Sequence, residues 1–235
     1  MKTDLLDIRN VENMDIMREF PDGHFDLAIV DPPYGLGEDG GTNRTKRVLQ
    51  KNGTRILCQD GGYKKKEWDK KTPKPEFFAE LKRVSKEQIV WGINYYPISW
   101  PGGRIIWDKV NEGSDQSDAE IAYCSLNSRV DIVRYMWRGM MQGRSIQQGH
   151  IQQGNKKLNE KRIHPTQKPV KLYEWLIEKY AFKGAKILDT HLGSGSIAIA
   201  SHYAGCHLTA CEADPEYFEE ACKRIHIGTS QTTLL

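Results

Sequence analysis

The sequence lacks a long apolar run. No stretch of its 235 residues approaches the roughly 20 consecutive apolar residues that a membrane-spanning helix needs, and the mean hydropathy is -0.64. The first residues, MKTDLLDIRN, carry acidic side chains and no apolar segment, so we expect no signal peptide. The sequence therefore predicts a soluble, cytoplasmic protein without a membrane partner.

Cysteine is scarce. The chain has five cysteines, an odd number, and no C-x-x-C pair. This usage is typical of reduced, mostly buried thiols in a cytosol rather than of a disulfide framework. The spacings also lack the paired ligands of a zinc site, so we expect no metal.

The chain also has no large excess of either positive or negative charge, because its net charge is only +3. This balance hides two basic segments: residues 35–75 hold eleven Lys and Arg against five Asp and Glu, and residues 125–163 hold eight against two. The rest of the chain is correspondingly acidic. Composition alone leaves two interpretations open, solvated loops or two arms that bind a polyanion.

Short apolar runs alternate with segments of helical periodicity, without internal repeats. We expect strands at 4–8, 25–30, 87–92, 103–108, 119–125, 185–190 and 207–212, and helices at 13–20, 76–85, 169–180, 196–204 and 215–225. Residues 36–72 resemble a long loop, and 126–163 are hard to assign. The alternation predicts a single α/β domain over 1–235 with a doubly wound, mostly parallel sheet, whose ligands bind beyond the carboxyl ends of the strands.

The segment KILDTHLGSGSIAIA, residues 186–200, has the pattern of a strand, a glycine-containing turn and a helix. Gly193 and Gly195 allow close approach of a ligand, and Glu212, after the next strand, suits a ribose. A dinucleotide fingerprint would have a third glycine, and no phosphate-binding lysine follows. With Asp189 before the turn, S-adenosylmethionine, which has an ammonium and no phosphate, fits better. The alternative is a tight turn without a ligand.

The segment IVDPPYG, residues 29–35, places polar and rigid residues directly after a strand. Pro32 and Pro33 remove two backbone donors and stiffen the loop, so Asp31 and the carbonyl groups offer hydrogen-bond acceptors beside the flat face of Tyr34. Such a corner can hold a planar exocyclic amine and assist its attack on a methyl donor. The alternative is a proline-rich turn with no further role.

Four segments together resemble one family: FDLAIVDPPYG, SDAEIAY, HPTQKPVKLYEWLIEKY and KILDTHLGSGSIAIA. Their set is similar to the amino-group DNA methyltransferases of the adenine-N6 type, and their order, with DPPY first and the glycine turn last, resembles the circularly permuted β group. The resemblance implies a Rossmann-like, doubly wound, seven-stranded, mostly parallel sheet with one antiparallel strand and two basic insertions. It also implies S-adenosylmethionine as the methyl donor and double-stranded DNA as the substrate.

The resemblance implies roles for individual residues. The catalytic positions are Asp31, Pro32, Pro33 and Tyr34. The cofactor-binding positions are Asp31, Thr166, Lys168, Asp189, His191, Gly193, Ser194, Gly195 and Glu212, together with Glu12 and Asn13 near the cofactor's adenine. Lys168 is expected to pair with the cofactor's carboxylate, or else to be a surface lysine. Thr190 and His191 replace the usual Pro-Phe of the turn, and His191 is either a substitute aromatic or a polar turn residue.

The two basic segments lie outside the resemblance. Residues 36–72 form a loop insertion that is placed to close over flipped DNA, and residues 126–163 are the candidate target-recognition region. The predicted DNA-binding residues are Arg44, Lys46, Arg47, Lys64, Lys65, Arg129, Arg134, Arg138 and Arg144. Trp137 is either a wedge between bases or, as we expect, part of the core.

Two other functions stay open at this point. A cytosine-N4 methyltransferase faces the same chemistry, although its family more often has Ser at the position of Asp31. A catalytically silent DNA-binding module of the same fold is the other alternative, suggested by the altered turn. A prokaryotic or phage-encoded protein is expected; a homodimer is compatible with the sequence, and any restriction nuclease would be a separate chain. The DNA target sequence is not evident.

Overall fold

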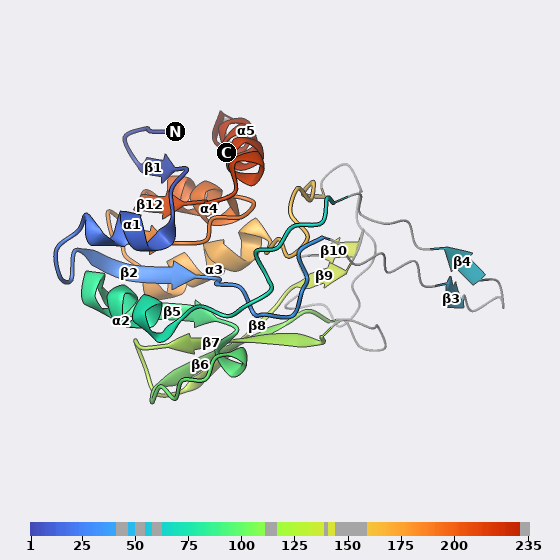
Figure 1. The fold of residues 1–235 in the computed structure, drawn as a ribbon, viewed down its shortest axis with the longest axis horizontal. Coiled ribbons are helices and arrows are strands. Elements are labelled where there is room, and N and C mark those ends of the chain that lie inside the picture. Colours follow the sequence, from blue (N-terminus) through green and yellow to red (C-terminus); the bar gives the residue numbers. More distant parts are fainter. Residues whose placement is uncertain are drawn as a thin grey trace.

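An eight-stranded sheet forms the centre of the computed structural model, which describes residues 1–40, 47–49, 55–57, 63–110, 117–138, 141–143 and 159–230 (Figure 1). The strand order is β1-β12-β11-β2-β5-β7-β6-β8. The strands are β1 (Leu6–Arg9), β2 (Phe25–Val30), β5 (Ser85–Trp91), β6 (Gly103–Asp108), β7 (Ala119–Cys124), β8 (Val130–Arg134), β11 (Lys186–Asp189) and β12 (His207–Cys211). The predicted doubly wound α/β sheet is thereby confirmed.

One strand of this sheet, β7, runs against the others. It pairs antiparallel with β5 and with β6, whereas the remaining pairs are parallel. The sheet has eight strands rather than the seven that we expected, because β8 pairs with β6 at the edge. Its segment, VDIVR, is short and has neither a continuous apolar run nor a strict alternation, and it lies in a stretch that we could not assign.

In the part of the chain that the structure describes, five α-helices cover the two faces of the sheet (Figure 1). They are α1 (Asn13–Arg18), α2 (Pro75–Val84), α3 (Val170–Tyr180), α4 (Ser196–Ala204) and α5 (Pro215–Ser230), and a short 3-10 helix, η1 (Ile93–Tyr95), follows β5. Buried side chains of α1 and α2 pack on one face, and those of α3, α4 and α5 pack on the other. The structure is therefore a three-layer sandwich. Among the described helices, we find none with the length and apolar character of a membrane span.

Two small antiparallel ribbons lie outside the main sheet. One pairs β3 (Arg47–Leu49) with β4 (Arg55–Leu57), inside the predicted loop insertion. The other pairs β9 (Met136–Arg138) with β10 (Met141–Gly143), inside the candidate target-recognition region. Neither ribbon was predicted, because three-residue strands carry too few side chains to show a period.

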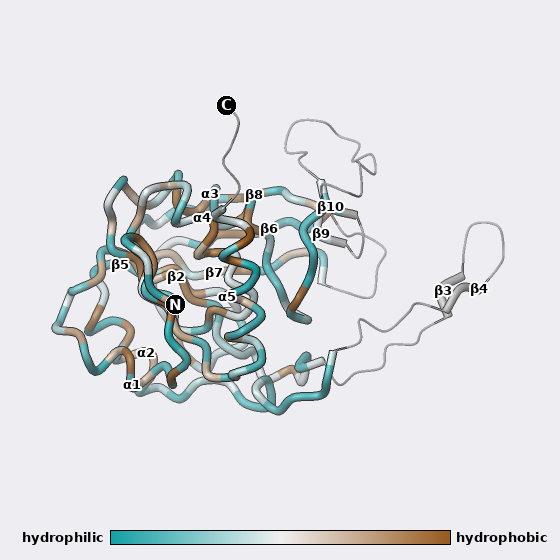
Figure 2. Tube along the Cα trace, turned by 90° about the horizontal axis from the view of Figure 1, so that it is seen from above, coloured by the Kyte–Doolittle hydropathy of each residue, from teal (hydrophilic) through white to brown (hydrophobic). Residues whose placement is uncertain are grey.

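The core explains why the apolar runs were reliable signals. In β2 and β5 nearly every side chain is buried, as expected for parallel strands covered on both faces. Figure 2 shows this hydrophobic interior along the strands and α4, with hydrophilic chain outside it. Cys124, Cys206 and Cys211 are buried free thiols within this core.

The topology brings the predicted functional loops to one edge. β12, β11 and β2 are parallel neighbours, with Asp189 opposite Ala210 and Leu188 opposite Ala28. Asp31 directly follows β2, and Glu212 directly follows β12. These acids therefore stand at the carboxyl ends of adjacent strands, where ligands of such sheets bind.

A core truncation tests the central position of β5. Ile89 on β5 is fully buried, whereas Ile132 on β8 is 57% exposed. Ile89→Ala should lower the free energy of unfolding by about 2–5 kcal/mol, because it leaves a cavity. The matched change Ile132→Ala should cost less than about 1 kcal/mol. Urea unfolding of both variants measures the difference, and equal losses would contradict this packing.

Candidate active site

The DPPY residues form a corner that is tied down on both sides. The Tyr34 hydroxyl donates a hydrogen bond of 2.6 Å to Oδ1 of Asp31. The backbone N–H groups of Tyr34, Gly35 and Glu38 donate to the carboxylate of Asp69, each at 2.8 Å. Asp69 is buried and was not predicted, since it lies 35 residues away in a segment without a motif. It supplies the acceptors that hold this loop in place.

The Pro32 carbonyl already has one partner. The Tyr96 hydroxyl donates to it at 2.8 Å, and Tyr96 is itself buried. A carbonyl oxygen has two lone pairs, so one acceptor position remains. Tyr96 thus fixes the direction of this carbonyl, a contact that the sequence did not indicate.

The ring of Tyr34 is fitted closely between neighbours. Tyr95 of η1 stacks on it, with ring centroids 5.0 Å apart and planes 20° apart. Gly92, at a φ of +71°, lies against it, and a Cβ there would stand 2.2 Å from Cε1 of Tyr34. The flat face of Tyr34 that was predicted as a stacking surface is therefore covered by Tyr95, which is the more exposed of the two rings.

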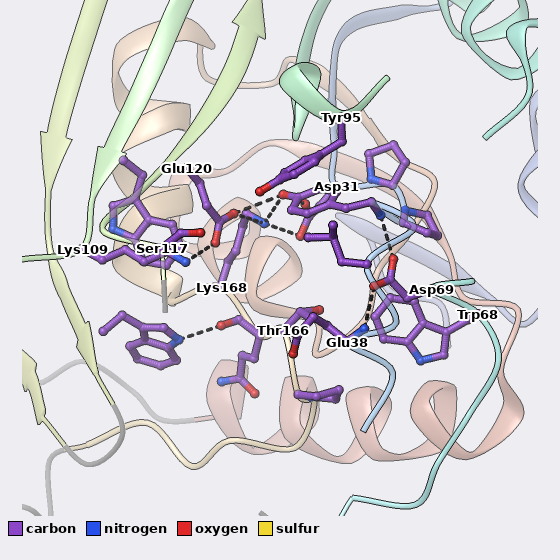
Figure 3. Close-up of a pocket in the computed structure, with 18 of the residues that line it drawn as sticks. Asp31, Glu38, Trp68, Asp69, Tyr95, Lys109, Ser117, Glu120, Thr166 and Lys168 are labelled. Atoms are coloured by element: carbon purple, nitrogen blue, oxygen red, sulfur yellow. Dashed lines mark hydrogen bonds and ion pairs between the residues drawn. The ribbon is translucent and has the colours of Figure 1, made fainter. Parts of the chain in front are cut away.

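Lys168 occupies a different place from the one expected. Its ammonium forms ion pairs with Asp31 and, at 2.9 Å, with Glu120, and its side chain is only 3% exposed (Figure 3). The interpretation of Lys168 as a surface lysine is therefore wrong, because its side chain is buried and pairs with carboxylates of the chain itself, whereas its pairing with the cofactor's carboxylate stays a prediction. The sequence could not show this, because the partners lie 137 and 48 residues away.

Glu120 is, after Asp69, a second acid of this site to which the sequence analysis assigned no role. It lies on β7 within the quoted segment SDAEIAY, and its other oxygen is 2.5 Å from the Lys109 ammonium. Figure 3 shows Glu120, Lys168 and Asp31 pointing toward one another. Two carboxylates and two ammonium groups thus form a buried, neutral cluster, which is how a protein interior accommodates charge.

A cavity of about 230 Å³ opens beside this cluster. Asp31, Pro32, Pro33 and Tyr34 line it, so the structure brings the predicted catalytic residues together. The aromatic part of the wall consists of Trp68, Tyr95, Trp107 and Trp137. Trp137 is buried and donates from Nε1 to the Gln167 carbonyl at 2.7 Å, which confirms it as core rather than as a free wedge. The cavity suits a flat ring with a polar edge.

A second cavity, of about 360 Å³, lies over the glycine turn. The Gly193 N–H donates to Oε2 of Glu212 at 2.9 Å, and the Asp214 N–H donates to Oε1 at 3.0 Å. The predicted cofactor residues that line this cavity are Glu12, Asn13, Asp31, Thr166, Lys168, His191, Gly193, Ser194 and Glu212. Its volume falls in the range of small-molecule sites.

Two predicted cofactor residues are absent from this lining. Asp189 is 2% exposed and accepts a hydrogen bond of 3.0 Å from the His191 N–H, so it stabilises the turn from the interior of the protein. Gly195, at a φ of +76°, begins α4 and makes room for Ile225, which a Cβ would meet at 2.8 Å. Asp189 and Gly195 thus affect the shape of the turn only, whereas the residues between them, 190–194, line the cavity.

His191 combines the two roles proposed for it. Its ring packs edge-on against Phe77, with centroids 5.3 Å apart, as an aromatic would. Its nitrogens also lie 3.1 Å from Nδ2 of Asn13 and 2.9 Å from Oγ1 of Thr190. Burial lowers the pKa of His191 to about 3, so the ring is neutral near pH 7. Burial likewise lowers the pKa of His164, another lining residue, to about 3.

The charges of the second cavity fit the predicted cofactor. Its described lining residues include four carboxyl groups, those of Glu12, Asp31, Glu212 and Asp214; Asp31 pairs with Lys168 and Asp214 pairs with Lys66 at 2.8 Å, while both histidines are neutral. Such a lining disfavours a phosphate and favours a cation. S-adenosylmethionine carries a sulfonium and an ammonium, and a carboxylate such as Glu212 suits its ribose.

The predicted DNA-binding residues are only partly described. Lys64 pairs with Glu216 at 2.8 Å, Arg129 with Asp131 at 3.1 Å and Arg134 with Asp108 at 2.8 Å, all with exposed cationic side chains. Lys65 is exposed as well. Arg44, Lys46 and Arg144, and the side chains of Arg47 and Arg138, lie outside the described residues. DNA contact by these residues stays a prediction.

Comparison with known proteins identifies the class. The family model described as DNA methylase matches residues 91–223, which is more than half of the chain. The chain therefore belongs to the DNA methylase family, whose members are S-adenosylmethionine-dependent DNA amino-methyltransferases. The predicted family, enzyme class and cofactor are confirmed.

Relatives extend this similarity beyond the matched region. The chain is 26% identical to the type II methyltransferase M2.DpnII of Streptococcus pneumoniae, over 85% of this chain and 82% of the relative. It is 24% identical to the type II methyltransferase M2.MboI of Moraxella bovis, over 91% of this chain and 85% of the relative. These alignments include most of the chain, and the family model by itself starts after the DPPY corner.

Solved structures show the same fold. The M1.HpyAVI complex with S-adenosylmethionine superposes with a TM-score of 0.54 at 16% identity, covering 94% of this chain and 99% of the other. The cytosine-N4-specific PvuII DNA methyltransferase gives 0.55 at 12% identity, covering 100% of this chain and 89% of the other. At these identities the likeness concerns the fold alone.

The close fit of Tyr34 against Gly92 yields a test. Gly92→Ala and Gly184→Ala both place a side chain at positive φ, but a Cβ at Gly184 meets nothing within 4 Å. Gly92→Ala should therefore lower the free energy of unfolding more than Gly184→Ala does, by about 1–3 kcal/mol for the added overpacking. Chemical denaturation of the two variants compares them, and losses of the same size would show that Tyr34 is not confined.

The buried carboxyl of Asp189 predicts a pH dependence. Burial raises the pKa of Asp189 to about 8, whereas an unfolded Asp ionises near pH 4. The native state holds the extra proton between these values, so this group lowers stability as pH rises from about 4 to 8. Asp189→Asn removes that dependence and can still accept the His191 N–H. The variant should gain stability over wild type, by up to a few kcal/mol at pH 8 since each pKa unit is worth about 1.4 kcal/mol.

Urea unfolding at pH 5, 6, 7 and 8 measures this difference. The expected result is an advantage of Asp189→Asn that grows with each step in pH. A difference that stays constant, or that shrinks as the pH rises, would mean that the carboxyl is ionised in the native state.

Proposed function

We propose that the chain transfers a methyl group from S-adenosylmethionine to the N6 amine of adenine in double-stranded DNA. One observation supports this most: the two cavities meet at Asp31. Asp31, Pro33, Trp68, Thr166, Gln167 and Lys168 line both of them. A methyl donor in the acidic cavity and an amine in the aromatic cavity would approach each other at this boundary.

S-adenosylmethionine supplies an electrophilic methyl group on a sulfonium. The chain's own residues have the task of presenting the amine. The nitrogen's lone pair is delocalised into the base, so the carboxylate of Asp31 and the free lone pair of the Pro32 carbonyl accept its hydrogens and favour the pyramidal transition state. Tyr34 and Tyr95 hold the ring so that the nitrogen lies in line with the methyl group.

The target base would have to leave the double helix. A base inside a duplex cannot enter a cavity at the end of a sheet, and flipping it out costs a few kcal/mol. Stacking on an aromatic side chain returns about 1–3 kcal/mol per base. The aromatic walls of the first cavity, with Tyr95 partly exposed, are suited to this role.

Adenine is preferred over cytosine because of Asp31. The resemblance associates an acid at this position with adenine-N6 transfer and a Ser with cytosine-N4 transfer. The fold does not separate the two, since a cytosine-N4-specific enzyme superposes as well as M1.HpyAVI does. Cytosine-N4 transfer is therefore the second candidate, and a catalytically silent DNA-binding module is the third.

The remaining finer predictions are proposals too. The circularly permuted order is supported by β11 and β2, which pair in parallel although the glycine turn follows the DPPY corner by more than 150 residues. Residues 36–72 and 126–163 are proposed as DNA-contacting insertions of a single domain. We also propose that the protein acts in a prokaryotic cytoplasm, where DNA is accessible; a homodimer is compatible with this proposal, and any restriction nuclease would be a separate chain.

Asp31→Ala tests the proposal. Loss of the acceptor should lower the rate of methyl transfer by about 100-fold or more, by analogy with the loss of one transition-state hydrogen-bond partner. Asp15→Ala, which removes an exposed acid of α1, is the matched control and should retain the wild-type rate. The measurement uses S-adenosylmethionine with a labelled methyl group and mixed-sequence duplex DNA, followed by digestion to nucleosides.

The labelled nucleoside decides between the candidates. Label in N6-methyldeoxyadenosine supports the proposal, and label in N4-methyldeoxycytidine supports the second candidate. DNA binding without any label, equal in wild type and Asp31→Ala, would establish the silent module instead.

A further inference from the structure

Glu120 is a half-buried acid at the target cavity to which the proposed reaction assigns no role. Its Oε2 lies 2.9 Å from the Lys168 ammonium and 3.1 Å from the oxygen of the Tyr34 hydroxyl, whose single proton is donated to Asp31. Its Oε1 lies 2.5 Å from the Lys109 ammonium. Its side chain is 17% exposed and lines the same cavity as Asp31. The Lys168 ammonium and the Tyr34 hydroxyl both contact the Asp31 carboxylate, and Glu120 contacts both of these groups as well.

Lys168 is shared between two acids. An ammonium has three donors, and Lys168 directs its donors to Asp31, to Glu120 and to the Tyr34 hydroxyl, which is 3.1 Å away. A cation that is fully engaged by one carboxylate makes that carboxylate a weaker base and a weaker acceptor. Because Glu120 takes part of the interaction, Asp31 keeps more of its acceptor strength for another partner.

Lys109 limits how strongly Glu120 attracts the Lys168 ammonium. It holds the second oxygen of Glu120 and lies over the Trp107 ring, 5.1 Å from its centroid, so it is fixed on the far side of the cluster. The sequence Lys109, Glu120, Lys168, Asp31 is therefore a chain of alternating charges that ends at the atom expected to meet the amine. Removing the charge of Lys109 and removing the charge of Glu120 should therefore shift the pKa of Asp31 in opposite directions.

We propose that Glu120 is a positioning residue for methyl transfer: by sharing Lys168 with Asp31, it keeps Asp31 an ionised but strong hydrogen-bond acceptor for the target amine. This role rests on the proposed function. It concerns β7, the antiparallel strand, which contributes the acid from across the sheet.

The titration behaviour of the cluster agrees with this arrangement. Burial raises the pKa of Asp31, Lys168 lowers it, and the charge of Glu120 raises it again. Burial opposes ionisation of Glu120 too, but Lys168 and Lys109 lower its pKa to about 2, so it is charged at every working pH. The other ionisable groups that interact with the Asp31 charge are Tyr34, Tyr96, Tyr173 and Asp189.

The test compares Glu120→Gln with Lys109→Met. Glu120→Gln leaves Lys168 to Asp31 alone and removes a like charge, so the pKa of Asp31 should fall. The acid limb of the pH-rate profile should then move to lower pH. The plateau rate should drop about 10–100-fold, as is typical when an outer partner of a site residue is lost. Lys109→Met removes a cation and frees Glu120 to draw Lys168 away, so the acid limb should move to higher pH.

Single-turnover methyl transfer at saturating DNA and S-adenosylmethionine, between pH 5 and 9, gives both profiles for the full chain. Glu174→Gln, which breaks the exposed ion pair with Lys171 on α3, is the matched control and should keep the wild-type profile. Calorimetry should show S-adenosylmethionine binding within about twofold of wild type in Glu120→Gln, which separates positioning from a general loss of structure.

Opposite shifts of the two acid limbs support the role. Limbs that do not move, or that move in the same direction, overturn it, and so does a rate loss that only follows weaker cofactor binding. If Glu120→Gln does not fold, Lys109→Met alone decides, by a shift to higher pH or its absence. No transfer by the wild-type chain would refute the proposed function and this role together, whereas normal wild-type transfer with unmoved limbs would refute the role of Glu120 alone.

Discussion

The buried ion pair between Lys168 and Asp31 connects the two parts of this site. Lys168 precedes α3 and lies beside the cofactor cavity, whereas Asp31 follows β2 and forms the wall between both cavities. Removing either charge alone would leave the other buried without a full partner, which is costly in a protein interior. The pair therefore links the loop after β2 to the segment before α3 at the boundary of the two cavities, and Glu120 and Lys109 balance its charges.

Short loops at the sheet edge are shaped by acceptors behind them. Asp69 collects three N–H groups of the DPPY loop, Glu212 collects those of Gly193 and Asp214, and Asp189 collects that of His191. Each of these carboxylates satisfies backbone donors that a tight turn would otherwise leave without partners. Of these three acids only Glu212 lines the second cavity, where it adds to the acidic character that suits a cationic ligand.

Several features could be predicted because they depend on local sequence. The apolar runs of β2, β5 and β11 identified buried parallel strands, and the acids that follow the strands identified the functional edge. β8, β9 and β10 were not predicted, because they have only three to five residues each and show no apolar run or regular alternation. Asp69, Tyr95 and Glu120 were missed for another reason: their partners are distant in sequence, and only the fold brings them to Asp31 or Tyr34.

The sequence by itself determined the class of the protein, the alternation of its long strands and helices, and the two segments, DPPY and the glycine turn, to which acceptor and donor roles are assigned. These follow from side-chain chemistry and from periods of a few residues. The tertiary structure alone decided that Lys168 faces Asp31 and Glu120, and that Asp189 and Gly195 support the turn from outside the cavity. Charge pairing acts through space over a few ångströms, and the chain positions that meet there are set by sheet topology.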